Sequence, residues 1–106
     1  MAKYLVVASY TAEGAKGLLK DGGTKRRQAA EQVLKSAGGK LEAFYFAFGE
    51  NDAYVIVDAP DNATVASASM AINASGAVRT KTIVLLSPEE IDQASKKGTT
   101  YQAPGH

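Results

Sequence analysis

The segment of residues 38–61 constrains the fold of this chain more than any other. It opens with the pair Gly38-Gly39, which ends a helix, and it closes with Pro60-Asp61, where the carboxylate can cap a new helix. Between these signals lie two runs rich in β-branched and aromatic residues, 40–48 and 53–58, separated by a short polar turn. The segment therefore predicts a helix, two strands joined by a turn, and a second helix in succession.

Residues outside this segment complete the pattern. β-branched and aromatic side chains without helical periodicity predict strands over 3–10 and 78–86. Apolar residues spaced three and four positions apart predict a helix over 24–37. A terminal helix is expected to begin at the capping box formed by Ser87 and Glu90, and to end at 96–98.

Two of the helical segments have an unusual composition. A helical start capped by Thr11 is interrupted by Gly17 and Gly22-Gly23, because glycine loses more backbone entropy in a helix than other residues do. The helix over 62–75 is rich in Ala and Ser, whose small side chains allow close approach to a sheet. Its larger packing residues are expected to be Val65, Met70 and Ile72.

The order β-α-β-β-α-β with a terminal helix is that of the ferredoxin-like motif. We therefore expect an α+β fold with an antiparallel four-stranded sheet in the order 4-1-3-2. A length of 106 residues with 45% hydrophobic content is typical of one globular domain. Residues 1–98 are expected to form this domain, and residues 99–106 an irregular tail.

The predicted strands are apolar on both faces, which a single layer of helices cannot cover. The second strand has phenylalanines on one face and other apolar residues on the opposite face: Phe44, Phe46 and Phe48 against Leu41, Ala43, Tyr45 and Ala47. Monomers rarely expose a contiguous apolar patch larger than about a few hundred Å². We therefore expect a homodimer in which a second copy covers the open sheet face.

Composition argues against several classes of function. The formal net charge is +1, so no bulk attraction to nucleic acid or to an acidic membrane surface is predicted. The run 50–57 is acidic where an RNA-recognition motif is basic, and Tyr54 is its single aromatic residue. No apolar stretch approaches the length of a membrane span. We expect a cytoplasmic protein without nucleic-acid or membrane partners.

The sequence contains few residues that could support metal or cofactor chemistry. The only histidine is His106 and there is no cysteine, which argues against a His- or Cys-based metal cluster and against a Ser-His-Asp triad within one chain. Glu50 and Asp52 are two carboxylates on one turn, which is weak evidence for a hard cation. The glycines at positions 14–23 match neither dinucleotide nor phosphate-loop spacing. The sequence predicts neither a metal nor a cofactor.

The predicted topology brings polar and aromatic residues to one end of the sheet. Tyr10, the turn of residues 48–52, Tyr54 and Arg79 meet at that end, and the helix that starts at Thr11 offers free N–H groups to an anion there. The residues expected to bind a ligand are Tyr10, Thr11, Lys16, Gly49, Tyr54 and Arg79. Their chemistry favours a small anionic or aromatic ligand.

These residues also have purely structural interpretations. Arg79 can neutralise Asp52 or meet water, and Gly49 suits the hairpin turn that Asp52 closes. Tyr54 fits a core or interface position better than a catalytic one. The basic run 25–27 lies in the first turn of a helix, where cations are mildly unfavourable. A solvated corner is the favoured interpretation of that run, and an anion site is the alternative.

Several short motifs together resemble the GYD-domain family. They are Tyr10-Thr11 with Gly14, Gly38-Gly39-Lys40, Phe44-Tyr45, Gly49 with Asp52, Asp58-Ala59-Pro60-Asp61 and Val78-Arg79-Thr80. The likeness runs from Lys3 to about Ile91. It departs from the family's Gly-x-Tyr-Asp turn at Asn51, which stands at the tyrosine position. The family comprises small bacterial and archaeal proteins of the dimeric α/β-barrel class without a settled activity, so the resemblance implies that fold rather than a reaction.

We interpret the sequence as that of a homodimeric small-molecule-binding barrel protein. The alternative is a cofactor-independent enzyme of oxygenase or isomerase type, because related barrels host such reactions on aromatic or lactone-like compounds. In that enzyme Asp52 would accept a proton, Arg79 would stabilise an anion, and Tyr10 or Tyr54 would donate a hydrogen bond. A third hypothesis is a structural partner without a pocket, whose tail of residues 101–104 docks on the neighbouring subunit.

Overall fold

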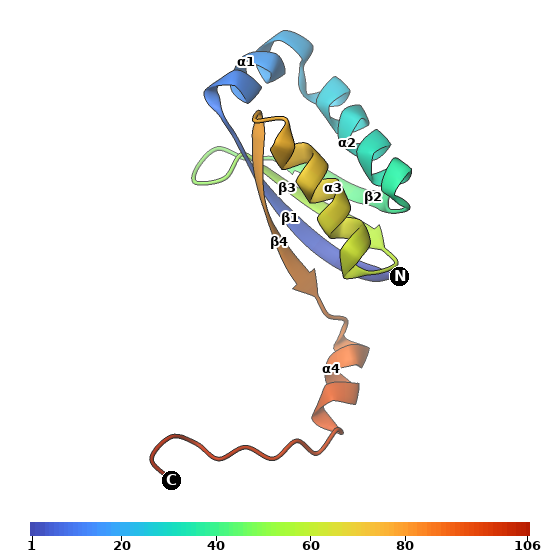
Figure 1. The fold of residues 1–106 in the computed structure, drawn as a ribbon, viewed down its shortest axis with the longest axis vertical. Coiled ribbons are helices and arrows are strands. Elements are labelled where there is room, and N and C mark those ends of the chain that lie inside the picture. Colours follow the sequence, from blue (N-terminus) through green and yellow to red (C-terminus); the bar gives the residue numbers. More distant parts are fainter.

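The computed structural model describes residues 1–106, and its centre is one antiparallel four-stranded sheet with helices on one face (Figure 1). The strands lie in the order β2-β3-β1-β4. They are β1 (Ala2–Tyr10), β2 (Lys40–Phe46), β3 (Ala53–Ala59) and β4 (Val78–Leu85). The helices are α1 (Ala12–Asp21), α2 (Gly23–Ala37), α3 (Asn62–Ala74) and α4 (Pro88–Ser95). The predicted α+β, ferredoxin-like arrangement and its strand order are confirmed.

The first helical region differs from the prediction. α1 is a continuous helix of 10 residues with Thr11 as its N-cap, although the sequence predicted only an interrupted start. Gly17 lies within α1 without breaking it, whereas Gly22 has a φ of +83° and separates α1 from α2. The left-handed backbone at Gly22 therefore ends the helix, because only this second position requires a conformation that glycine adopts easily.

β2 ends two residues earlier than predicted. The backbone N–H of Ala47 donates to the carbonyl oxygen of Asp52 at 2.8 Å, which closes the turn before Phe48 can extend the strand. Phe48 is fully exposed as a result. The predicted strand face of three phenylalanines is thus reduced to Phe44 and Phe46, whose rings pack edge to face at 5.0 Å.

The hydrophobic core lies between the sheet and the helices α2 and α3. Alternate residues of the central strands point toward the helices, and the main cluster combines them with α2 and α3 side chains. Its buried members are Tyr4, Leu34, Val57, Ala59, Val65 and Ala68. Met70, predicted to pack there, is 73% exposed on α3, because Val65 and Ala68 already define the buried side of that helix.

The opposite face of the sheet carries no helix (Figure 1). Antiparallel pairing aligns Leu5 with Ile56 and Ile83, and Val7 with Tyr54, so an apolar band crosses this open face. A register shift between Leu41 and Ala43 changes the alternation at the start of β2. Leu41 therefore packs against the helix-side core, on the same face as Phe44, which corrects its predicted place on the face opposite the phenylalanines.

α4 and the residues after it extend away from the sheet and the other helices (Figure 1). A capping box between Ser87 and Glu90 starts α4, as predicted, but none of its residues is buried. None of the four helices combines the length and the apolar character that crossing a membrane requires.

Candidate functional site

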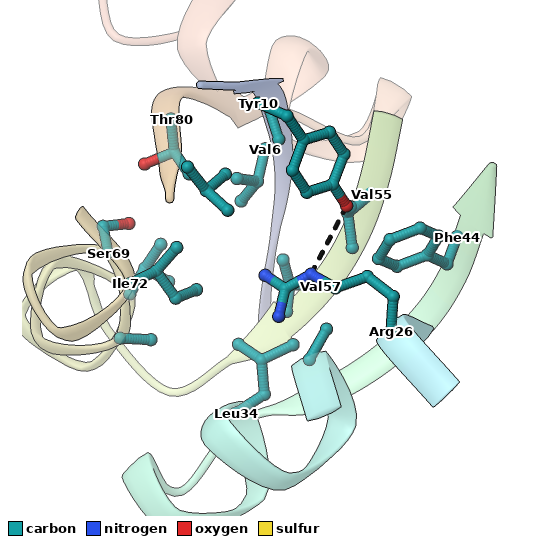
Figure 2. Close-up of a pocket in the computed structure, with 15 residues that line it drawn as sticks. Val6, Tyr10, Arg26, Leu34, Phe44, Val55, Val57, Ser69, Ile72 and Thr80 are labelled. Carbon is teal, nitrogen blue, oxygen red and sulfur yellow. Dashed lines mark hydrogen bonds between the residues drawn. The ribbon is translucent and has the colours of Figure 1, made fainter. Parts of the chain in front are cut away.

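An apolar cavity lies between the sheet and the helices α2 and α3 (Figure 2). Its volume is about 50 Å³, and 12 of its 15 lining residues are hydrophobic, so its interior offers few hydrogen bonds. The strands contribute Val6, Ala8, Tyr10, Phe44, Val55, Val57, Val78 and Thr80. The helices contribute Arg26, Ala30, Leu34, Val65, Ala68, Ser69 and Ile72.

Small side chains create this space. Ala8, Ala30 and Ala68 each lie on a different element that faces the cavity, β1, α2 and α3 respectively, and all three are buried. A larger side chain at any of these positions would fill the volume, because protein interiors otherwise pack at the density of organic crystals. The Ala- and Ser-rich composition of α3 predicted close packing of this helix against the sheet. The same small side chains also leave empty space beside Val65.

Arg26 is the only charged residue that lines the cavity. It is half-buried near the start of α2, and Figure 2 shows its guanidinium group directed into the cavity toward Tyr10. Its Nε donates to the Tyr10 hydroxyl at 3.3 Å, and the guanidinium carbon lies 5.9 Å from the centre of the Tyr10 ring. No carboxylate lies within ion-pair distance of Arg26.

The structure divides the basic run 25–27 between two environments. Lys25 pairs with Asp21 at 3.8 Å and Arg27 pairs with Glu31 at 3.7 Å, both on the exposed surface of the helices. Arg26 instead points to the cavity. The favoured interpretation of the run as a solvated corner therefore holds for its two outer members and is wrong for Arg26, whose position on the inner face of α2 the charge pattern did not reveal.

A second, wider depression of about 500 Å³ lies between α1, α2 and the end of α3. Four residues line both this depression and the apolar cavity: Tyr10, Arg26, Ile72 and Val78. The Arg26–Tyr10 pair therefore stands where the two spaces meet. A molecule entering from the depression would contact the guanidinium before it reached the apolar interior.

The predicted site residues divide between the two faces of the sheet. Tyr10 lines the cavity on the helix side. Arg79 on β4 pairs in register with Ser9, the residue before Tyr10 on β1. Successive residues of a strand point to opposite faces of a sheet, so Arg79 belongs to the open face, together with Tyr54. Arg79 there lines a separate depression of about 530 Å³ with Ser9, Asn51 and Lys81 among its neighbours. The two faces of one sheet thus separate Tyr10 from Arg79, although both lie near the same end.

At the start of α1, where an anion site was predicted, the chain itself binds the N–H groups of Thr11 and Gly14. Thr11 donates its backbone N–H to the carbonyl oxygen of Ala77 at 3.0 Å and its hydroxyl to that of Gly76 at 2.9 Å. The same hydroxyl accepts from the N–H of Gly14 at 3.2 Å. Lys16 is exposed farther along α1, and Gly49 is exposed in the hairpin turn.

Asp52 fastens the hairpin turn to the central strand. Its Oδ2 accepts a hydrogen bond from the backbone N–H of Tyr10 at 2.8 Å, and its own N–H donates to the carbonyl oxygen of Ala8 at 2.9 Å. No ion pair joins Asp52 to Arg79. The three residues weighed for catalysis, Asp52, Arg79 and Tyr10, are therefore not assembled around one space within the chain.

Asn51, where the sequence departs from the Gly-x-Tyr-Asp pattern, connects the hairpin turn to the open face. Its side-chain amide donates to the Tyr54 hydroxyl at 3.4 Å, and its carbonyl oxygen accepts from the Ser9 hydroxyl at 3.3 Å. Asn51 thus has a structural role, because it links the turn to Tyr54, a predicted site residue, and to Ser9 on β1.

Comparison with known proteins supports the family likeness. The family model described as GYD domain matches residues 4–95, which is most of the chain. The search of curated proteins found no match.

Proposed function

This chain belongs to the GYD-domain family, and from that premise we propose that it is a homodimeric protein that binds a small molecule in the cavity between its sheet and helices α2 and α3. The cavity is the observation that carries this proposal. Ligand sites are characteristically concave and mostly apolar, with a few convergent polar groups that orient the ligand. The cavity combines an apolar lining with one polar pair, Arg26 and Tyr10, at its junction with the outer depression.

The open sheet face supports the dimeric part of the proposal. Ile83 and Tyr54 belong to the apolar band of that face and are 49% and 39% exposed, and Tyr45, which pairs with Tyr54, is 72% exposed. Covering such a band removes apolar surface from water, which favours association at roughly 25 cal/mol per Å² before the entropic cost of binding. α4 lies away from the body and does not cover this face (Figure 1).

Charged side chains lie at both ends of the open face, and their balance differs between the two ends. At one end Lys3 donates to Glu42 at 2.7 Å and to Asp58 at 2.9 Å, so two carboxylates surround one ammonium group. The hydrogen bond with Glu42, followed by that with Asp58, raises the pKa of Lys3 above its ordinary value of 10.5, so this ammonium group is charged near neutral pH. Lys40 pairs in register with Asp58, so at this end Lys3 and Lys40 balance Glu42 and Asp58.

The other end of the open face has an excess of positive charge. Arg79 and Lys81 line the depression there with one carboxylate, that of Glu50. Two copies stacked with their strands in opposite directions would place the balanced end of each against the basic end of the other, which keeps the two basic ends apart. A two-fold symmetric interface presents the same patch on both subunits, so this arrangement repeats at both ends of the interface.

The binding proposal predicts that filling the cavity abolishes ligand uptake. We expect 1-butanol, a small amphiphilic probe, to shift the backbone amide NMR signals of Ala8, Val57 and Ala68 in the unmodified protein. Ala68→Val adds two methyl groups inside the cavity and should abolish these shifts. Ala66→Val makes the same change at an exposed position two residues earlier on α3 and should leave them intact.

Equal shifts in both variants, or no shifts in the unmodified protein, would contradict the proposal. A melting measurement on each variant separates blocked binding from lost folding, since a folded Ala68→Val protein keeps a cooperative transition.

A further inference from the structure

We infer that the ligand of this cavity is a short-chain alkyl carboxylate whose carboxylate binds Arg26 and whose alkyl chain enters the apolar interior. The inference deepens the proposed function and rests on it. It assigns a charge and a size to a ligand that the proposal leaves open.

The first argument is the unsatisfied hydrogen-bonding capacity of Arg26. A guanidinium group carries five N–H donors arranged to match the two oxygens of a carboxylate. In this structure one of them, Nε–H, donates to a neutral hydroxyl, that of Tyr10. The group is half-buried beside an apolar lining, where a cation without an anionic partner is costly. A bound carboxylate would supply the missing charge and acceptors.

The second argument is that the protein offers Arg26 no anion of its own. Glu13 and Asp21 also line the outer depression, but neither forms an ion pair with Arg26. Asp21 pairs with Lys25 instead. The neighbouring cations of the same helix turn therefore have carboxylate partners within the chain, and Arg26 has none.

The third argument is the size of the cavity. Its volume of about 50 Å³ exceeds the space of roughly 10–15 Å³ that a single water requires. It is well below the roughly 150 Å³ of apolar cavities that hold benzene. An aromatic ring therefore exceeds the interior with Arg26 in its present position, whereas a short, flexible alkyl chain matches it.

The test compares two probes of equal shape, butanoate and butanamide, which differ in charge. We expect butanoate to bind about ten- to a hundredfold more tightly at pH 7, the range associated with a charge-assisted hydrogen bond. Titrations followed by the amide signals of Ala8, Val57 and Ala68 give both dissociation constants. Arg26→Gln should remove the preference, and Arg26→Lys should retain part of it because the charge remains.

Arg27→Gln is the matched control, since it makes the same change at the adjacent, exposed residue. It should leave the preference for butanoate unchanged. If Arg26→Gln does not fold, the two-probe comparison in the unmodified protein and in Arg26→Lys still decides the question.

The outcomes separate this inference from the proposed function. Equal binding of butanoate and butanamide would overturn the assignment of a carboxylate while leaving a small-molecule cavity in place. A preference that survives in folded Arg26→Gln would place the anion elsewhere and would also overturn it. Failure of both probes and of 1-butanol to bind would contradict the proposed function itself.

Discussion

At the scale of single residues, Gly14 shows how a backbone contact holds the first helix in place. A Cβ atom built on Gly14 would lie 1.9 Å from the carbonyl oxygen of Ala77, a distance that no side chain tolerates. Gly14→Ala should therefore lower the free energy of unfolding by about 1–3 kcal/mol, the usual cost of overpacking, as measured by urea denaturation.

Gly17, one turn later on the same helix, provides the control for this prediction. A Cβ atom at Gly17 would meet no atom within 4 Å. Gly17→Ala should raise the free energy of unfolding by about 0.5–1 kcal/mol, because alanine is the better helix former. A neutral Gly14→Ala variant would show that α1 can separate from the segment at Ala77.

At the scale of elements, the N-cap of α3 makes its stability depend on pH. Asp61 accepts hydrogen bonds from the backbone N–H and the hydroxyl of Thr64, each at 2.8 Å. The backbone hydrogen bond first, and the hydroxyl second, lower the pKa of Asp61 below its ordinary value of 3.8. The charged carboxylate is thus favoured in the folded state, and its contribution is present above about pH 3.8.

That contribution should disappear as the pH falls through the lowered pKa of Asp61. Melting temperatures of the unmodified protein and Asp61→Asn, measured from pH 2 to pH 7, should differ near neutrality and converge in acid. Asp92→Asn, at an exposed position on α4 that makes no such cap, should run parallel to the unmodified protein. A constant difference between Asp61→Asn and the unmodified protein would show that the cap acts without its charge.

At the scale of the whole molecule, the open sheet face is expected to decide the oligomeric state. Ile83→Lys places a charge in the apolar band of both subunits. Losing the burial of one isoleucine on each subunit costs roughly 1.5–3 kcal/mol apiece, so the dimer should weaken at least about a hundredfold. Native mass spectrometry and light scattering should show a dimer that becomes a monomer in this variant.

Met70→Lys is the control for the assembly, because Met70 is 73% exposed on α3, on the helix side of the sheet. It should leave the dimer intact. A monomeric unmodified protein at micromolar concentration would remove the second copy from the proposed function, while leaving the cavity and its test unaffected.

Much of the fold could be predicted from local signals along the chain. The glycine pair before β2, the cap at Asp61 and the capping box at Ser87 each act within a few residues, so they mark the element boundaries without reference to the tertiary structure. The remaining features of the fold depend on long-range contacts, which could not be predicted from local signals. The position of α1 against the segment at Ala77 depends on the absence of a side chain at Gly14, and the exposure of Met70 depends on which side of α3 meets the sheet.

The candidate site was predictable only in part. Tyr10 was expected to bind a ligand, and it does line the cavity, but Arg26 was assigned to a solvated corner. In the sequence, Arg26 is one of three consecutive cations, and nothing in that run distinguishes the residue that faces inward. The small residues of α3 that line the cavity were interpreted only as a means of close packing.

The sequence by itself determined the order of strands and helices and the ferredoxin-like class, because periodicity, caps and turn residues act over short stretches of chain. Its short motifs also carried the resemblance to the family. The tertiary structure alone decided how side chains combine into a site. Strand register places Tyr10 and Arg79 on opposite faces of the sheet, and helix packing turns Arg26 inward between two neighbours that turn outward. Both outcomes depend on contacts between residues far apart in the chain, which no local pattern encodes.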